Sequence, residues 1–330
     1  MAKADSASPE TRTRAQFYCK PKRGLGKMEH EVPGVWLEYL GLFAGKPFTI
    51  PKEAKEGRFM LIIEPRRHEF LPLVLSNFCS LMCPLGWRLV VAHGSFNRHW
   101  LLQHRFFRPT NPEDIVWIDL DHENLTLEQY NALLLSFPIW TFLHESLGCR
   151  DVLIFQVDTL LLRPERIDTA FAGHYGFVGA PWQEGYMECY YPGLRVGNGG
   201  LSMRNVPKML QYLARIPTIM AESRCCAEDA CFSIAAQQDP TSRMPTIEEA
   251  SEFAVESVLV HPDPCGFHKA YKFHDCTEII RTHLDARCRT SSGSGFAASS
   301  GSGFAAASGS GFAASSSAAI QAWITSISTE

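Results

Sequence analysis

VLIFQVD, residues 152–158, joins four apolar residues to a single acidic side chain, Asp158. The apolar run at 152–155 predicts a buried strand, which would deliver the Asp158 side chain into a cleft at the C-terminal edge of a sheet. A carboxylate in that position could hold a divalent metal ion. The alternative is a structural role, because Asp followed by Thr159 is also ordinary turn chemistry in which the side chain caps the turn.

Strands and helices alternate along the chain before this segment. Buried strands are predicted at residues 59–63, 87–91 and 115–118, and helices at 68–81, 126–135 and 139–147. Thr126 and Gln129 have the spacing of a capping box at the start of the second helix. This order predicts an α/β domain with a Rossmann-like, mostly parallel central sheet and helices on both faces. Its ligands would bind beyond the C-terminal ends of the strands.

The composition is that of a folded protein without a strong net charge. Of the 330 residues 45% are hydrophobic, which supports a real core, and 31 basic against 35 acidic residues give a net charge of -4. This balance offers no electrostatic reason to expect a nucleic-acid partner. The sequence contains no apolar N-terminal segment typical of a signal peptide and no apolar run of about 18 residues, so we expect a cytoplasmic protein without a membrane segment.

The second half of the chain contains several side chains that suit a ligand site. The candidates are Trp182, Asn198, Glu228, Asp229, His261, His268 and Lys269. An Asp at a strand end and a late His are suitable ligands for Mn²⁺ or Mg²⁺, and the ion could also bridge a diphosphate. Lys269 would add a second positive charge on the same phosphates.

Glu228 and Asp229 form an acidic pair that predicts the first turn of a helix, where a carboxylate is electrostatically favoured. If one of them faces the cleft, it could take the proton from an attacking hydroxyl group. The pair also has a purely structural interpretation, because acidic residues are common in first helical turns.

Other candidates have structural alternatives too. Trp182 could stack on a sugar ring or pack in the core. The glycines around Asn198, at 197, 199 and 200, lie in a predicted loop, where they would permit close approach to a ligand or form an ordinary tight turn. His261 and His268, each taken singly, suit a core or surface position better than metal binding.

Six short motifs follow one another in a fixed order. They are FQVDT (155–159), GAPW (179–182), VGNGGLSMR (196–204), EDACF (228–232), FAVE (253–256) and GFHK (266–269). This succession resembles a poorly characterised family of glycosyltransferase-like domains, which is similar in turn to the nucleotide-sugar-dependent glycosyltransferases of the GT-A fold. The resemblance implies a metal-assisted transfer, with Mn²⁺ or Mg²⁺, from a nucleoside diphosphate sugar to a hydroxyl of a glycan, protein or small molecule.

The resemblance also implies roles for individual residues. Asp158 would be the surviving acid of an Asp-x-Asp metal motif, and His268 would be the late metal-binding histidine. Asp229 would act as the base, with Glu228 beside it, and direct displacement would invert the anomeric centre. The implied contacts to the donor are Glu64, Arg66, Gln156, Trp182, Asn198 and Lys269.

One position departs from the pattern, because Gln156 stands where the first acid of the Asp-x-Asp motif is expected. A neutral amide can contact the ribose or a metal-bound water, but the loss of one carboxylate should weaken divalent-ion binding. A second hypothesis is therefore a sugar- or nucleotide-binding module that has this fold and no turnover. The spacing from His261 to Gly266 is too long for an alternative His-x-x-Gly-x-x-Lys pattern, which favours His268.

The chain divides into three parts in this interpretation. Residues 1–57 form an N-terminal arm and a peripheral element, 58–289 the GT-A-like catalytic domain, and 290–330 a low-complexity tail of Ser, Gly, Phe and Ala. In the tail SGSGFAA occurs three times at a period of eight. We expect this segment to be disordered, because three isolated phenylalanines cannot offset the entropy of ordering it. A weakly self-associating tail is the functional alternative.

Overall fold

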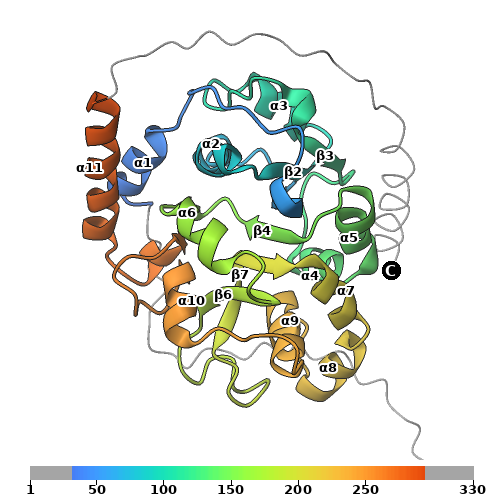
Figure 1. The fold of residues 1–330 in the computed structure, drawn as a ribbon. Coiled ribbons are helices and arrows are strands. Elements are labelled where there is room, and N and C mark those ends of the chain that lie inside the picture. Colours follow the sequence, from blue (N-terminus) through green and yellow to red (C-terminus); the bar gives the residue numbers. More distant parts are fainter. Residues whose placement is uncertain (1–31, 294–330) are drawn as a thin grey trace, which may run out of the picture.

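The computed structural model describes residues 32–293, and the side chains of residues 32–289. Its centre is a six-stranded sheet with the strand order β3-β2-β1-β4-β7-β6 (Figure 1). The strands are β1 (Arg58–Glu64), β2 (Arg88–His93), β3 (Val116–Asp119), β4 (Asp151–Phe155), β6 (Phe177–Pro181) and β7 (Val196–Asn205). Strands β1 to β4 pair in parallel, whereas β7 runs antiparallel to both β4 and β6. The predicted α/β fold with a mostly parallel central sheet is confirmed.

Two hydrophobic layers cover the two faces of this sheet. Successive side chains of a strand point to opposite faces, and β1 accordingly divides its side chains between the layers. Met60 and Ile62 belong to the first layer, and Phe59 and Leu61 belong to the second. The first layer contains α1 (Gly34–Gly41) and α2 (Leu71–Met82); the second contains α4 (Leu127–Leu134), α5 (Phe137–Thr141), α7 (Val206–Leu213), α8 (Ile216–Ser223) and α9 (Glu228–Gln237). In Figure 1, α2 and α9 lie on opposite sides of β4.

The predicted helices form, with some ends shifted. α2 begins at Leu71 rather than at residue 68, and its second residue is Pro72, which is well suited to the first turn of a helix because its missing N–H has no partner there. The capping box of α4 forms as predicted: the Gln129 N–H donates to Thr126 Oγ1 at 3.2 Å, and the Thr126 N–H donates to Gln129 Oε1 at 2.9 Å. The helix expected at 139–147 is instead α5 followed by a π-helical turn, Phe142–Ser146.

A second, smaller sheet joins a short strand after β4 to two strands that lie far later in the sequence. It consists of β5 (Thr159–Leu161), β9 (Gly266–His268) and β8 (Ala254–Val255), and β8 follows α10 (Ile247–Phe253). Strands β5 and β9 are antiparallel, with Thr159 opposite His268. This pairing was not predicted, and it brings Asp158 beside the end of β9.

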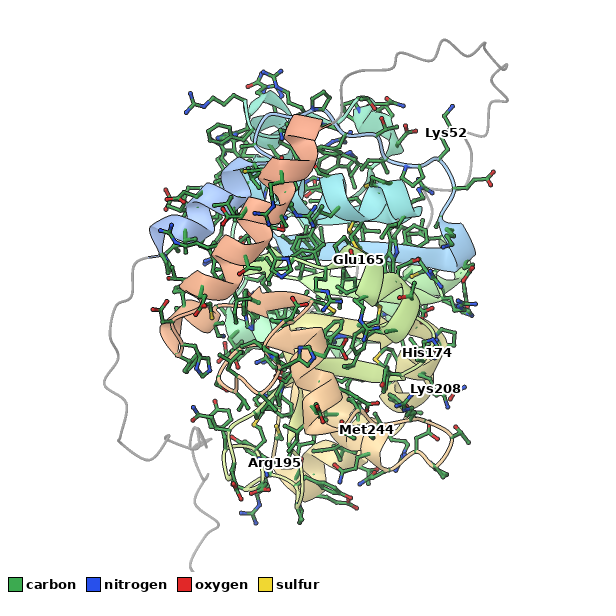
Figure 2. All side chains as sticks on the ribbon, turned by 60° about the vertical axis from the view of Figure 1, so that its left-hand side comes forward. Lys52, Glu165, His174, Arg195, Lys208 and Met244 are labelled. Atoms are coloured by element: carbon green, nitrogen blue, oxygen red, sulfur yellow. The ribbon has the colours of Figure 1, made fainter. Side chains whose placement is uncertain are left out.

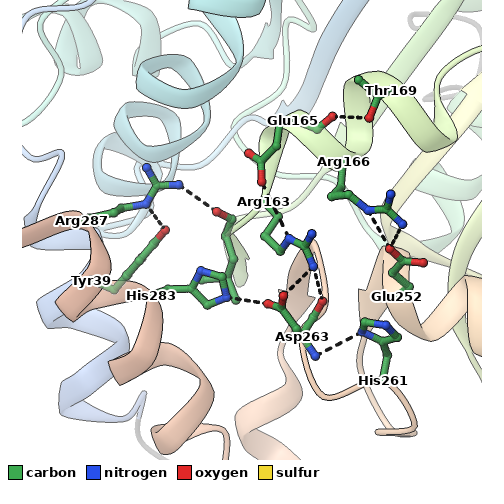
Figure 3. Close-up of polar contacts among 11 residues, drawn as sticks. Tyr39, Arg163, Glu165, Arg166, Thr169, Glu252, His261, Asp263, His283 and Arg287 are labelled. Atoms are coloured by element: carbon green, nitrogen blue, oxygen red, sulfur yellow. Dashed lines mark hydrogen bonds and ion pairs between the residues drawn. The ribbon is translucent and has the colours of Figure 1, made fainter. Parts of the chain in front are cut away.

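The described part of the N-terminal segment packs into the fold. Trp36 and Tyr39 of α1 are buried in the first hydrophobic layer. The long helix α11 (Thr277–Gly293) is held against α1 by Arg287, which donates to the Tyr39 hydroxyl and to the Leu162 carbonyl, both at 2.8 Å (Figure 3). α11 thus crosses residue 290, where the low-complexity tail was expected to begin. Residues 1–31 and 294–330, which include most of the predicted arm and tail, lie outside the described residues.

Charged side chains are spread over the molecule rather than gathered at one end. Lys52, Glu165, Lys208 and Arg195 lie at successive heights from top to bottom of Figure 2. This agrees with the mixed charge of the sequence. Within residues 32–293, no helix is both long enough and apolar enough to cross a membrane.

Candidate active site

A cleft of about 1150 Å³ opens at the C-terminal ends of β1 and β4. The chain passes from β1 to β2 and β3 on one side and then returns to β4 on the other, so the cleft lies at a topological switch point, where open α/β sheets bind their ligands. All ten residues to which the resemblance gives a role line it, namely Glu64, Arg66, Gln156, Asp158, Trp182, Asn198, Glu228, Asp229, His268 and Lys269. The switch point and the second sheet together gather residues that span more than half of the chain.

The Asp158 carboxylate is not needed for the turn in which it lies. Thr159 closes that turn, because its N–H and its hydroxyl both donate to the Gln156 carbonyl, at 3.2 and 2.6 Å. Asp158 Oδ1 is buried without a hydrogen-bond partner, and His268 Nε2 lies 3.4 Å from it. Burial alone would raise the pKa of Asp158, but His268 and Lys269 outweigh it and lower that pKa below the ordinary value. The side chain is therefore an anionic group directed at the cleft.

His268 lies at the end of β9 and is only 2% exposed. Its Nδ1 atom is 2.8 Å from Asn198 Oδ1, and its Nε2 atom is 3.1 Å from Gln156 Oε1. The ring rests directly on strand β7, since a Cβ atom added at Gly200 would lie 2.1–2.4 Å from three of its atoms. The Gly-rich stretch around Asn198 is thus part of a strand, and the predictions of a loop or a tight turn there are wrong. The absent side chain at Gly200 makes room for the histidine.

Lys269 has a strained backbone and a paired side chain. Its φ of 39° lies in the left-handed region that residues other than glycine rarely adopt, and its N–H donates to the Asp158 carbonyl at 2.8 Å. Its Nζ atom is 3.1 Å from Glu256 Oε1. Burial lowers the pKa of Lys269, but the carboxylates of Glu256 and Asp158 outweigh it and raise that pKa above the ordinary value, so the ammonium is charged.

The two members of the acidic pair have different environments. Both oxygens of Glu228 are occupied by the buried guanidinium of Arg204, at 2.5 and 3.0 Å. Asp229 has no such partner; it accepts the N–H groups of Gly199 at 3.0 Å and Ala230 at 2.8 Å. Burial, and then the negative charge of Glu228, raise the pKa of Asp229 to about 7. Glu228 is therefore engaged in a structural ion pair, and Asp229 is the member suited to exchange a proton near neutral pH.

Glu64 and Arg66 form an ion pair at the end of β1. Arg66 Nε and Nη2 donate to the two oxygens of Glu64, at 2.8 and 2.7 Å. Glu64 is buried, whereas half of the Arg66 side chain is exposed to solvent. The loop after β1 is held from below by Asn97, whose Nδ2 atom donates to the carbonyls of both residues. The pair thus presents one oriented guanidinium at the edge of the cleft.

The structure distinguishes between the alternative roles that the sequence left open for Trp182 and His261. Trp182 lines the cleft but is only 2% exposed and belongs to the second hydrophobic layer, so its environment favours the packing interpretation over stacking on a sugar ring. His261 does not line the cleft. Its Nδ1 atom accepts the Asp263 N–H at 3.1 Å in a separate polar cluster (Figure 3).

Two residues of the site were missed as candidates. Glu256 lines the cleft and contacts both Asn198 and Lys269, and Arg204 neutralises Glu228 from behind the cleft. Both lie within the motifs FAVE and VGNGGLSMR, but their spacing in the sequence does not indicate which side chains they contact. Their importance follows from contacts between segments that are distant in the chain.

The lining of the cleft is rich in acidic groups. It contains five carboxyl side chains, Glu64, Asp158, Glu228, Asp229 and Glu256, against the cations of Arg66 and Lys269. Three of the five are paired with an Arg or Lys side chain. Asp158 and Asp229 form no ion pair of that kind within residues 32–289. A diphosphate would therefore meet a negative surface near Asp158 unless a cation accompanied it.

The donor atoms beside Asp158 fit a divalent cation. Asp158 Oδ1, Gln156 Oε1 and His268 Nε2 converge, and the carboxylate oxygen is buried without a hydrogen bond. Oxygen ligands with one imidazole suit Mn²⁺, and oxygen-rich sets suit Mg²⁺. Among the described residues, no group of three or more His, Cys, Asp or Glu side chains is arranged as a metal centre. The third donor here is the amide of Gln156, at the position where the sequence departs from the Asp-x-Asp pattern.

The chain is similar to a family of unknown function and, distantly, to solved structures of a galactosyltransferase. The family described as "protein of unknown function (DUF5672)" matches residues 114–268, a range that contains Asp158, Asp229 and His268 but neither Glu64 nor Lys269. Among solved structures, the galactosyltransferase LgtC in complex with donor and acceptor sugar analogues is 13% identical, with a TM-score of 0.43, over 69% of this chain and 95% of that chain. An active-site mutant of LgtC is 12% identical, with the same TM-score and coverage. No curated protein matches the chain in sequence.

Proposed function

We propose that this protein is a glycosyltransferase that moves a sugar from a nucleoside diphosphate sugar to a hydroxyl group of a glycan, protein or small molecule. One observation carries the proposal. A single cleft contains donor atoms of Asp158 and His268 that suit a cation, the charged Lys269, and the carboxylate of Asp229 with a pKa of about 7. The cation ligands and Lys269 suit a departing diphosphate, and the Asp229 carboxylate suits an attacking hydroxyl.

The residues of the cleft supply the groups that a direct displacement needs. Asp229 takes the hydroxyl proton of the acceptor while the acceptor oxygen forms a bond to the anomeric carbon. The bond from that carbon to the diphosphate oxygen breaks, and its electron pair leaves with the diphosphate, whose charge Lys269 stabilises. A single displacement of this kind inverts the anomeric configuration. A product with retained configuration, read by proton NMR, would contradict the role of Asp229 as base.

Asp158, His268 and Gln156 would hold Mn²⁺ or Mg²⁺, which neutralises diphosphate charge when bound. Arg66 is held by Glu64 with half of its side chain exposed, so it is free to contact the nucleotide from the end of β1. Asn198 supports this half of the cleft by contacting His268. Trp182 supports it by packing, because its ring is buried and has no exposed face for a ligand.

A thermal-shift screen tests the donor. Nucleoside diphosphates and nucleotide sugars, each with and without Mn²⁺, should raise the melting temperature, because a ligand at 100 times its Kd adds about 2.7 kcal/mol to the free energy of unfolding. We expect the shift to need Mn²⁺ and to be lost in Asp158→Ala and His268→Ala. His261→Ala is the matched control, because that histidine lies outside the cleft.

Turnover separates this proposal from a binding module. Donor hydrolysis or transfer should depend on Mn²⁺ and on both Asp158 and Asp229. If the chain binds a nucleotide sugar without any metal-dependent turnover, and Asp158→Ala binds equally well, the chain is a binding module instead. The neutral Gln156 is the feature that favours this second outcome.

A further inference from the structure

We propose that Asn198 and Glu256 are positioning residues that fix His268 in the tautomer with its proton on Nδ1, so that the lone pair on Nε2 faces the cleft. The inference rests on the proposed function in one respect, namely that His268 contacts a cation there. Neither Asn198 nor Glu256 needs to touch the cation or the substrate. Both act through the histidine.

The orientation of the Asn198 amide follows from two contacts at its opposite ends. The Gly200 N–H donates to Oδ1 at 3.1 Å, which requires an oxygen at that end. The other end, Nδ2, donates to Glu256 Oε2 at 3.0 Å, which requires a nitrogen there. Exchanging the two atoms would place an N–H₂ group against an N–H donor and an oxygen against a carboxylate. The oxygen therefore points toward His268.

The protonation of the His268 ring follows from this orientation. Nδ1 lies 2.8 Å from Asn198 Oδ1 and 3.5 Å from Glu256 Oε1, and both of these atoms are acceptors, so Nδ1 carries a proton. In the neutral ring Nε2 then has a lone pair. That lone pair faces Gln156 Oε1 at 3.1 Å and Asp158 Oδ1 at 3.4 Å. A histidine that binds a metal through one nitrogen commonly donates its other N–H to a carbonyl or carboxylate in this way.

In the opposite tautomer, with the proton on Nε2, His268 could not bind a cation through that nitrogen. With a proton on Nε2, the ring would donate to Asp158 or Gln156 and would turn no lone pair toward the cleft. Gln156 Oε1 and Asp158 Oδ1 are acceptors as well, so without a cation they favour a second proton on Nε2; a bound cation would take the place of that proton. The residues behind the ring are buried, since Asn198 and Glu256 are 9% and 6% exposed.

Glu256 connects the histidine to the lysine beside it. Its Oε2 atom holds the Asn198 amide, and its Oε1 atom pairs with Lys269 Nζ at 3.1 Å. One carboxylate thus orients both groups that face the diphosphate in the proposed reaction. This explains why an acidic residue lies buried at the back of a cleft that would bind an anion.

Nitrogen-15 NMR of the histidine rings tests the tautomer without any metal or nucleotide. With His268→Gln to assign the signal, and at mildly alkaline pH, wild-type His268 should carry its proton on Nδ1. Asn198→Ala should shift the proton toward Nε2, and Asn198→Asp, which keeps an acceptor oxygen, should restore it. Asn205→Ala, on the same strand but outside the cleft, should leave the signal unchanged.

Calorimetric titration with Mn²⁺ alone tests the consequence. Asn198→Ala and Glu256→Ala should weaken Mn²⁺ binding by about 10- to 100-fold, the usual effect of removing a residue that orients a metal ligand. Glu252→Ala removes a nearby carboxylate outside the cleft and should leave the affinity unchanged. Circular dichroism and the melting temperature show which variants are folded.

The outcomes separate the inference from the proposed function. A proton on Nε2 in the wild type, or a folded Asn198→Ala variant with an unchanged tautomer and unchanged Mn²⁺ affinity, would overturn the positioning role. If the tautomer behaves as expected but the wild type binds no Mn²⁺, the metal-assisted reaction fails and the positioning of His268 stands.

Discussion

At the scale of single residues, the ionisation of Asp229 determines when it can act as a base. Burial and the neighbouring Glu228 raise its pKa to about 7, so the carboxylate form increases as the pH rises through neutrality. We expect kcat/KM to rise with pH to a plateau above about 7, and Asp229→Asn to lose about 10²- to 10⁴-fold in kcat. A pH–rate profile of both proteins checks this. Wild-type activity in Asp229→Asn would show that another group is the base.

The same carboxyl predicts a change in stability. Its pKa in the folded protein lies above the ordinary value of 3.8, so the folded state binds the proton more tightly than the unfolded state does. The resulting stabilisation is complete below about pH 4 and is lost as the pH rises through about 7. Asp229→Asn should therefore gain stability relative to the wild type as the pH increases over this range. Urea unfolding at pH values near 5 and 8 measures the difference; a pH-independent difference would contradict the raised pKa.

At the scale of elements, strand β7 forms the floor of the site because its glycines leave room for side chains from other elements, such as the His268 ring at Gly200. An added Cβ at Gly200 would lie 2.1–2.4 Å from the His268 ring, so Gly200→Ala must displace the histidine. We expect Mn²⁺-dependent nucleotide binding to fall at least tenfold while the fold is retained. The control is Gly41→Ala, because a Cβ there meets nothing within 4 Å. Unchanged nucleotide affinity in folded Gly200→Ala would argue against a role for His268 in the cleft.

At the scale of the whole molecule, the two ends of the described chain support the fold at a distance from the cleft. Arg287 on α11 joins Tyr39 of α1 to the Leu162 carbonyl (Figure 3). Arg287→Ala should lower the free energy of unfolding by about 1–3 kcal/mol, because it removes two part-buried hydrogen bonds of about 0.5–1.5 kcal/mol each, and should leave nucleotide affinity unchanged. Denaturant unfolding and a binding titration measure the two effects. Arg281→Ala, an exposed position on the same helix, is the control; a nucleotide affinity that falls with Arg287→Ala would show that α11 supports the cleft directly.

The four parallel strands of the central sheet could be predicted because their signal is local. The apolar runs at 59–63 and 152–155 are buried on both sides, and such strands can be recognised without knowing their neighbours. The second sheet could not be predicted in this way. Its strands are two or three residues long, and β5 pairs with β9 across more than a hundred positions.

The sequence by itself therefore determined the four parallel strands β1 to β4, the position of Asp158 after the last of them, and the set of polar residues worth considering. Only the tertiary structure decided which of these residues are partners. Arg204 neutralises Glu228 and leaves Asp229 free, and Asn198 and Glu256 hold His268. The physical reason is that apolar periodicity is a property of a short segment, whereas the charge and orientation of a buried polar group depend on side chains brought to it from distant parts of the chain.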